Sequence, residues 1–149
     1  MVVHLHPLRH GRVWLRRHML NVAAMDEAAQ VLVGRHDFTT FRSGQCQARS
    51  PVRTIDAISV HRHGDEVHLH VSAPSFLHNQ VRSIAGSLDL VGHGKWETQH
   101  LHEALLSCDR RMCGPVAPPE GLYLSRVLYP DHLQRLLTNE HASEKIFAS

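Results

Sequence analysis

The sequence is short of cysteine and of long apolar runs. Its three cysteines, Cys46, Cys108 and Cys113, form no CxxC pair among 149 residues. This odd set excludes a paired zinc-ligand pattern and favours a reducing compartment. No apolar run approaches the ~20 residues of a membrane helix, and no signal peptide, internal repeat or low-complexity tract is present. These absences predict a soluble, cytoplasmic protein without a membrane partner.

Length and charge narrow the range of possible partners. A chain of 149 residues suits one domain that buries roughly two-thirds of its unfolded surface. The net charge is +2 with histidine neutral, and 15 histidines add positive charge below pH ~6.5. This mildly basic balance is compatible with RNA binding without proving it.

Residues 73–92 carry the clearest pattern, a helix with one arginine beside its apolar face. Ser75 is the expected N-cap, and Gly92 is the expected glycine after the last turn. The residues at helical spacing are Leu77, Val81, Ile84, Ala85, Leu88 and Val91. An arginine in the place of Arg82 is either held for a carboxylate or phosphate, or extends to solvent from the edge of the core.

A strand over residues 11–16 and a helix over residues 22–33 are expected before this segment. Asn21 would cap the helix and Gly34 would end it. The apolar face of that helix consists of Val22, Met25, Ala29 and Leu32. Residues 37–50 read as a loop, with two aromatic side chains, Phe38 and Phe41, expected to anchor it in the core.

Residues 58–71 alternate around a Gly64-Asp65 turn and predict a β-hairpin. In this register His61 faces His68, and Val60 faces Leu69. One face would then carry Ile58, Val60, Val67, Leu69 and Val71, and the other would carry His61, His63, His68 and His70. Four histidines on adjoining strands could bind Zn²⁺ or Ni²⁺, but no metal site is assigned because histidine is enriched along the whole chain.

The later segments complete the fold prediction. A helix over residues 98–107, a Pro/Gly-rich loop over 114–121 and a final strand over 122–129 are expected. Leu101 and Leu105 would be buried on one side of that helix. The order of elements predicts an α+β fold, an antiparallel sheet with helices packed on one face.

Several blocks of sequence resemble, in order and spacing, the C-terminal half of the tRNA pseudouridine synthase A family. The resemblance runs from about Val13 to Pro130. The blocks that carry it are residues 34–42, 45–55, 73–92, 109–110, 114–124 and 127–130. It implies a pseudouridine synthase C-terminal-type domain over residues 1–130, followed by a weakly ordered tail over 131–149.

The resemblance also implies roles for individual residues. Family members carry a catalytic aspartate in an N-terminal domain, and Arg82 stands where the family places the arginine that pairs with it. Asp56 follows an Arg-Thr-Ile sequence but lies where the family continues into a strand, so it is not the expected nucleophile. Leu122 matches an apolar residue that packs against the target base, although a core leucine is the alternative. The reaction needs no cofactor.

The remaining candidate contacts are weaker. Phe76 and His78 are candidate substrate contacts, although a core position is favoured for Phe76 as for its neighbour Leu77. Arg35, Arg42 and Arg53 could contact RNA phosphates, or could simply be solvated.

This chain departs from the family pattern at four positions, and none of them is expected to touch Arg82 or Leu122. The four positions are Asn79, Ser83, Cys113 and Val116.

These patterns favour a tRNA pseudouridine synthase of the anticodon arm, represented by its C-terminal half without the nucleophilic aspartate. The chain alone is expected to be inactive. Its expected partners are tRNA, a second copy in a homodimer, and an N-terminal catalytic half. The alternatives are a non-catalytic RNA-binding module and an inactive fragment.

Overall fold

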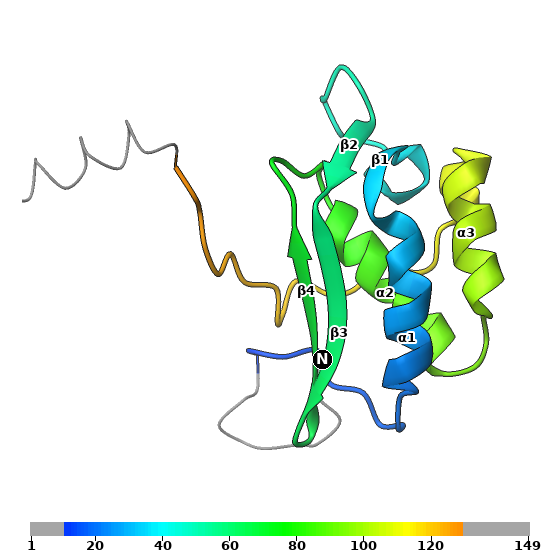
Figure 1. Cartoon of the computed structure of the whole chain (residues 1–149), viewed down its shortest axis with the longest axis vertical. Coiled ribbons are helices and arrows are strands. Elements are labelled where there is room, and N and C mark those ends of the chain that lie inside the picture. The colour runs from blue at the N-terminus through cyan, green and yellow to red at the C-terminus, as the bar shows by residue number, and fades with distance from the viewer. Residues whose placement is uncertain (1–10, 130–149) are drawn as a thin grey trace, which may run out of the picture.

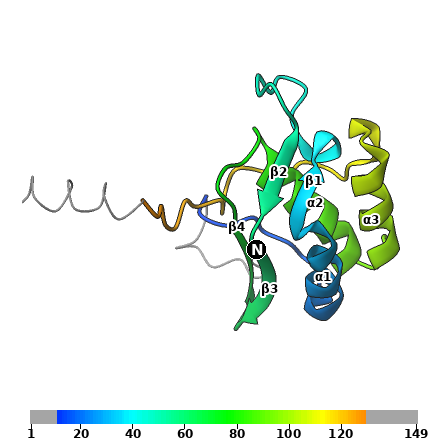
Figure 2. The same cartoon turned by 45° about the horizontal axis from the view of Figure 1, so that its top comes forward.

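Three α-helices and two antiparallel strand pairs make up residues 11–129, the part of the chain that the computed structural model describes (Figure 1). The predicted tail over residues 131–149 lies outside this part. The elements are α1 (Val22–Ala29), β1 (Gly34–Asp37), β2 (Val52–Ile55), β3 (Ala57–His63), β4 (Glu66–Ser72), α2 (Gln80–Gly92) and α3 (Thr98–Ser107). The helices lie on one side of the β3–β4 hairpin, and the segment after residue 121 leaves on the other side (Figures 1 and 2). The predicted α+β class is confirmed.

The β3–β4 hairpin has the predicted register. His61 pairs with His68, and Val60 pairs with Leu69. Ile58, Val60 and Val67 are buried against the helices, whereas His61 is exposed on the opposite face. The turn residue Gly64 has φ +58°, a conformation that glycine adopts without strain.

The first helix agrees with the prediction except at its end. The Asn21 side chain caps α1 by accepting a hydrogen bond from the Ala24 N–H at 3.1 Å. The last predicted turn is a tighter 3₁₀ turn over Gln30–Leu32. Gly34 does not follow the helix as a cap but begins β1, which pairs with β2. Strand β1 was not predicted because its sequence, Gly-Arg-His-Asp, has no apolar alternation.

Helix α2 begins four residues later than predicted: it starts at Gln80, after Asn79, rather than after Ser75. Asn79 precedes it with φ +62°, so the chain turns sharply there and cannot continue a helix backwards. Gly92 is the last helical residue and not the predicted residue beyond the end. A Cβ at Gly92 would lie 2.6 Å from the Met25 Sδ atom, so a larger residue there would make the Met25 side chain shift between α1 and α2.

Neither predicted terminal strand forms in the described residues. Residues 11–16 contain only an isolated bridge at Leu15, and residues 122–129 belong to no helix or strand. A strand is defined by hydrogen bonds to a neighbour. Both segments were predicted as strands, but the sequence did not show a neighbouring strand that either could join.

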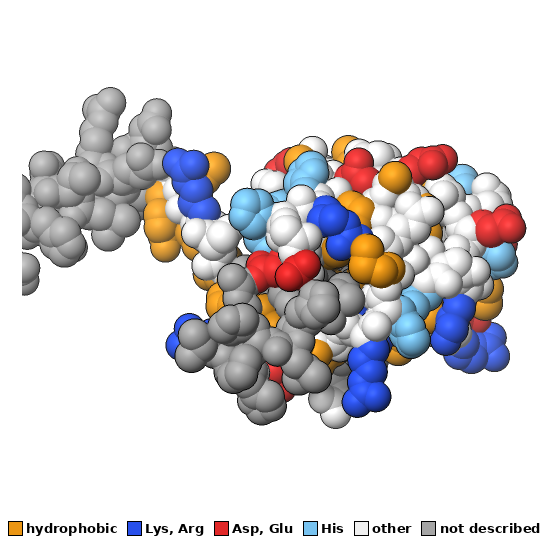
Figure 3. Space-filling view, turned by 90° about the horizontal axis from the view of Figure 1, so that it is seen from below, with side chains coloured by type: hydrophobic (Ala, Val, Ile, Leu, Met, Phe, Trp, Pro, Cys, Tyr) orange, Lys and Arg blue, Asp and Glu red, His pale blue; other side chains and the backbone are white. Residues whose placement is uncertain are grey.

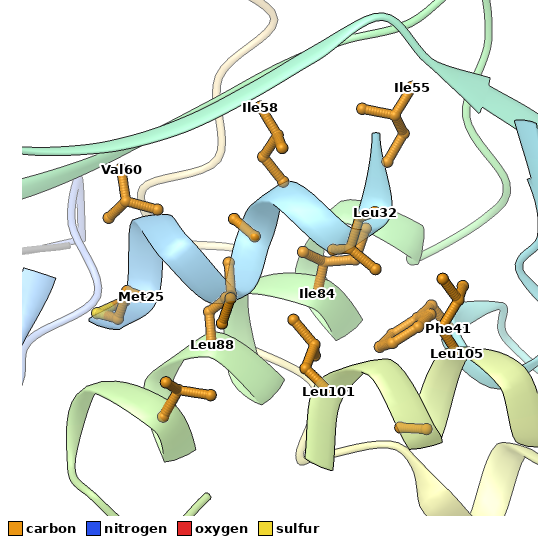
Figure 4. Packing of buried hydrophobic residues seen from close by; sticks show 14 of the residues in the cluster. Met25, Leu32, Phe41, Ile55, Ile58, Val60, Ile84, Leu88, Leu101 and Leu105 are labelled. Carbon is orange, nitrogen blue, oxygen red and sulfur yellow. The ribbon is translucent and has the colours of Figure 1, made fainter. Parts of the chain in front are cut away.

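The core lies between the helices and the β3–β4 hairpin (Figure 4). Phe38 and Phe41 are fully buried and anchor the loop after β1, as predicted. Leu101 and Leu105 of α3 are also buried, as predicted. The other large buried side chains include Leu32, Ile55, Ile84 and Leu88.

Candidate functional site

Arg82 lies in the first turn of α2, and its guanidinium is held by two oxygen atoms. Nε donates to the Ala117 carbonyl oxygen at 2.7 Å, and Nη1 donates to the Asn79 Oδ1 atom at 3.0 Å. No carboxylate pairs with Arg82 within residues 11–129. Neither of the two bonds uses the Nη2 donors, so the arginine is positioned while part of its donor set remains available.

Asn79 holds this arginine from a left-handed backbone conformation. Its φ of +62° is tolerated better by asparagine than by most residues. Its carbonyl oxygen accepts the Ser83 N–H at 2.9 Å, and its side chain accepts from Arg82. The expectation that none of the four departing positions touches Arg82 is therefore wrong at Asn79.

The segment over residues 114–117 lies directly on α2 and supplies the second contact to Arg82. The Ala117 N–H donates to the Arg82 carbonyl oxygen at 3.0 Å, so the two residues are joined in both directions. The Gly114 N–H donates to Ser87 Oγ at 3.0 Å. A Cβ at Gly86 would lie 1.6 Å from the Pro115 carbonyl oxygen, so this approach is possible only with glycine on the helix.

The buried polar face of α2 explains why the predicted apolar stripe was too narrow. Ser83 and Ser87 are fully buried, whereas the predicted Val81 and Ala85 are only partly buried. The Ser87 hydroxyl donates to the Ser83 carbonyl oxygen at 2.9 Å and accepts from Gly114. Small polar residues on this face make room for the backbone of residues 114–117.

The candidate substrate contacts are exposed. Leu122 is 50% exposed, so the alternative of a core leucine does not hold in the described residues. Phe76 is 40% exposed, and its expected core position is wrong, whereas Leu77 is buried as expected. His78 is exposed, and its carbonyl oxygen accepts the Ser43 N–H at 3.0 Å.

Exposed apolar side chains gather on residues 122–129, which we call the C-terminal apolar segment. The exposed members are Leu122, Tyr123, Leu124, Val127, Leu128 and Tyr129. Figure 3 shows hydrophobic side chains where this segment leaves the body of the protein. The Tyr123 hydroxyl donates to the Arg12 carbonyl oxygen at 2.6 Å, which ties the start of the segment to the domain. A surface of this kind is typical of a place where another chain or segment packs.

Two of the three candidate phosphate-binding arginines come together. Arg35 and Arg53 line a hollow of about 270 Å³ with polar and small side chains, and no acidic residue lines it. The other lining residues are Ser50, Val52, Thr54, Pro74 and Ser75. The Arg53 Nη1 atom donates to the Ser50 and Val52 carbonyl oxygens at 3.0 and 2.7 Å, which fixes its guanidinium.

Arg42 does not line this hollow, and it lies instead near Cys46. Backbone hydrogen bonds from Ala48 and His78 lower the pKa of the Cys46 thiol, and the charges of Arg42 and Arg53 act in the same direction. Sequence reasoning did not single out Cys46 as a reactive thiol, because one of the backbone hydrogen bonds that lower its pKa comes from His78, 32 residues further along the chain.

The four hairpin histidines lie together but do not form a metal site. The His63 and His68 rings are 5.8 Å apart, and the His68 and His70 rings are 6.0 Å apart. Within residues 11–129, no group of three or more His, Cys, Asp or Glu side chains is arranged to hold a metal ion.

In the same residues, no helix is both long and apolar enough to cross a bilayer.

An α+β domain that fixes an arginine with no carboxylate partner in the described residues, and that also exposes apolar and basic side chains, is suited to form part of a nucleic-acid-modifying site. Comparison with known proteins identifies the family. A family model described as tRNA pseudouridine synthase matches residues 28–130, and the chain belongs to this family.

Curated relatives agree with the family assignment. The chain is 61% identical over 118 residues to "tRNA pseudouridine synthase A" of Afipia carboxidovorans, an alignment that covers 79% of this chain and 48% of the relative. It is 57% identical over 122 residues to the protein of that name from Parvibaculum lavamentivorans, covering 82% and 50%. The identity is 54% over 123 residues for Rhodospirillum rubrum, covering 83% and 44%. The chain thus spans about half the length of these relatives.

Proposed function

We propose that this chain provides the arginine-bearing half of a tRNA pseudouridine synthase that isomerises uridine to pseudouridine in the anticodon arm. One observation carries the proposal: Arg82 is fixed at the start of α2 and has no carboxylate partner in the described residues. The relatives' name, tRNA pseudouridine synthase A, supports the reaction and the substrate class.

The chemistry of the reaction explains what such an arginine would do. The reaction breaks the glycosidic bond of a uridine and rejoins the uracil through carbon, with an aspartate acting covalently on the nucleotide. A guanidinium beside that aspartate lowers the carboxylate pKa and fixes its orientation through paired N–H donors. The Nη2 donors of Arg82 are the ones available for this contact. No cofactor is required.

The aspartate would come from an N-terminal half that is not part of the described residues. Asp56 is exposed between β2 and β3 and forms no ion pair with Arg82 there. The C-terminal apolar segment gives that half a surface on which to pack, because six of its side chains are exposed. We propose that the assembled enzyme is a homodimer and that it works in the cytoplasm. The three free cysteines support the second point, because a reducing compartment keeps thiols unpaired.

Three exposed side chains would contact the substrate. Leu122 would form an apolar wall for the extruded uracil, and Phe76 and His78 would contact the nucleotide from the loop before α2. The hollow lined by Arg35 and Arg53 would bind a phosphate of the tRNA backbone, and Arg42 would add a weaker, salt-dependent attraction. The tRNA would be recognised mainly by its shape and backbone.

Tritium release from tRNA labelled at uridine C5 tests the catalytic proposal. We expect no release from the chain alone, and release when the N-terminal half of a relative is added. Arg82→Lys should abolish the restored activity, since lysine cannot reproduce the fork of donors. Arg49→Lys, at an exposed site that makes none of the contacts of Arg82, is the matched control for the change from arginine to lysine. Release by the chain alone would refute the proposal, because a nucleophile would then lie within this sequence.

The hollow beside Arg35 and Arg53 favours a second candidate, an RNA-binding module without catalysis. In that case the chain would bind tRNA, and adding the N-terminal half would restore no modification. A filter-binding measurement at two salt concentrations, run beside the tritium assay, separates the two functions.

A further inference from the structure

A second basic hollow lies at the other end of α2 from Arg82. It has a volume of about 690 Å³, and none of its described lining residues is acidic. Its lining residues are Leu15, Arg16, Arg17, His18, Met19, Gly92, His93 and Lys95. Ten helical positions separate Arg82 from Gly92, which corresponds to roughly 15 Å along the helix axis. We call this the α2-end hollow, and nothing in the proposed reaction uses it.

One wall of the hollow is fixed by a buried ion pair. The Arg16 Nη2 atom donates to the Asp89 Oδ2 atom at 2.6 Å, and the Asp89 side chain is only 3% exposed. The Arg16 guanidinium also lies 4.8 Å from the centre of the Trp14 ring. Asp89 therefore neutralises Arg16, and their contact holds residues 15–19 against the end of α2.

Two further hydrogen bonds attach the same segment to the fold. The Asn21 N–H donates to the Gly92 carbonyl oxygen at 2.9 Å, and the Arg62 Nη2 atom donates to the Leu20 carbonyl oxygen at 2.9 Å. The wall is thus connected to both α2 and β3. A pre-formed wall lowers the cost of ordering side chains when a ligand binds.

Two further positive groups of the hollow are exposed side chains. Arg17 and Lys95 are exposed, and neither forms an ion pair within residues 11–129. The His18 ring lies with its edge toward the His93 ring at 5.7 Å. The His93 Nε2 atom is buried and has no hydrogen-bond partner in the described residues. The His93 Nδ1 atom lies 3.4 Å from the Asp89 Oδ1 atom, so this buried carboxylate is shared by Arg16 and His93. Exposed positive side chains without a carboxylate partner, as Arg17 and Lys95 are in the described residues, are typical of a site for a phosphate group.

We propose that the α2-end hollow binds a phosphate group through Arg17 and Lys95, with His18 and His93 beside them. The phosphate could be free phosphate or a diester in an RNA backbone, because both present the same oxygens to these side chains. The inference does not depend on the proposed function, since no residue of the hollow takes part in the contacts of Arg82.

Tryptophan fluorescence gives a direct measurement. Both tryptophans of the chain adjoin the hollow: Trp14 contacts Arg16, and Trp96 follows Lys95. We expect inorganic phosphate, titrated at constant ionic strength, to change the fluorescence with saturation. The double variant R17Q/K95Q should weaken phosphate binding about fivefold or more, because two unpaired charges are removed. The matched control R49Q/R126Q removes two exposed arginines outside the hollow and should leave the affinity unchanged.

A second titration with a ten-nucleotide uridine RNA distinguishes the two phosphate sources. If R17Q/K95Q weakens both ligands, the hollow binds backbone phosphate. If it weakens inorganic phosphate alone, the ligand is free phosphate. The proposal is overturned if neither ligand is affected or if R49Q/R126Q weakens phosphate binding equally. Thermal unfolding of each variant checks the fold, and Arg82→Lys should not change phosphate affinity, which separates this test from that of the catalytic proposal.

Discussion

Gly86→Ala is the sharpest single test of how Arg82 is held. The added Cβ would lie 1.6 Å from the Pro115 carbonyl oxygen, 2.8 Å from the Pro115 carbonyl carbon and 3.2 Å from the Ala117 nitrogen. Backbone atoms occupy this space, so no side-chain rotation relieves the contact. Residues 115–117 must move away from α2, and both hydrogen bonds between Arg82 and Ala117 must lengthen or break.

The expected change in the free energy of unfolding is the balance of two destabilising contributions and one stabilising contribution. Overpacking costs about 1–3 kcal/mol. Loss of the charge-assisted bond from Arg82 adds about 1.5 kcal/mol. Alanine is preferred to glycine within a helix by about 1 kcal/mol, which opposes these costs. We expect the free energy of unfolding to fall by about 2 kcal/mol, which lowers Tm by about 6 °C at this chain length.

The assay combines thermal unfolding with the NMR signal of the Arg82 Nε–H group. Gly44→Ala is the matched control, because a Cβ at Gly44 meets nothing within 4 Å and its φ is not positive. G44A should leave both readouts unchanged. If G86A leaves Tm at or above the wild-type value and also leaves the Arg82 signal unmoved, the close approach of residues 115–117 to α2 is wrong.

Three further predictions concern single groups. Asn79→Ala should lower the free energy of unfolding by about 1 kcal/mol more than Asn79→Gly does, as measured by urea unfolding. Both variants lose the contact to Arg82, but only glycine adopts φ +62° without strain. Equal losses of stability would contradict this. Burial raises the pKa of Asp89 above its ordinary value of 3.8 despite the nearby Arg16, so at pH values between the unfolded and folded pKa the folded state holds a proton that the unfolded state has released. Stability should then fall as pH rises from about 4 through the folded pKa, and Asp89→Asn should remove this part of the slope in pH-dependent urea unfolding; identical slopes would refute it. Iodoacetamide should alkylate Cys46 before Cys108 at pH 8 by mass spectrometry, because backbone hydrogen bonds lower the thiol pKa of Cys46 and burial raises that of Cys108; earlier labelling of Cys108 would count against it.

Local patterns in the sequence were enough to predict some helices and strands but not others. The β3–β4 register followed from a Gly64-Asp65 turn and strict alternation, both of which are readable within a few residues. The start of α2 was missed because Asn79 takes a left-handed conformation that its residue type permits but does not require. Strand β1 was missed because its pairing with β2 joins two polar segments across a fourteen-residue loop, residues 38–51.

For the candidate site too, some features could be predicted from the sequence and others could not. The position of Arg82 came from the resemblance to the family and from its place beside an apolar stripe. Its contact with Ala117 joins residues 35 positions apart, and no periodicity within either segment predicts it. Gly86 could have indicated this close approach. A glycine within a helix costs about 1 kcal/mol relative to alanine, so its presence suggests that another segment packs against the helix there.

The way Arg82 is held bears on whether this half of the site retains a function. An arginine kept only for its charge would be expected to extend into water, where its side-chain entropy is greatest. Here Asn79 adopts an uncommon backbone conformation and Gly86 admits a backbone segment, and together they fix the guanidinium before any carboxylate arrives. A donor fixed in advance needs little reorganisation when its partner binds, and this is the property that makes electrostatic stabilisation effective in active sites. These constraints are internal to the described residues, so they should persist when the N-terminal half is absent. Adding the N-terminal half in trans should therefore restore activity by association alone. The rate of recovery should be limited by binding of the two halves and not by refolding around Arg82. A lag before recovery that does not depend on the concentration of the added half would contradict this.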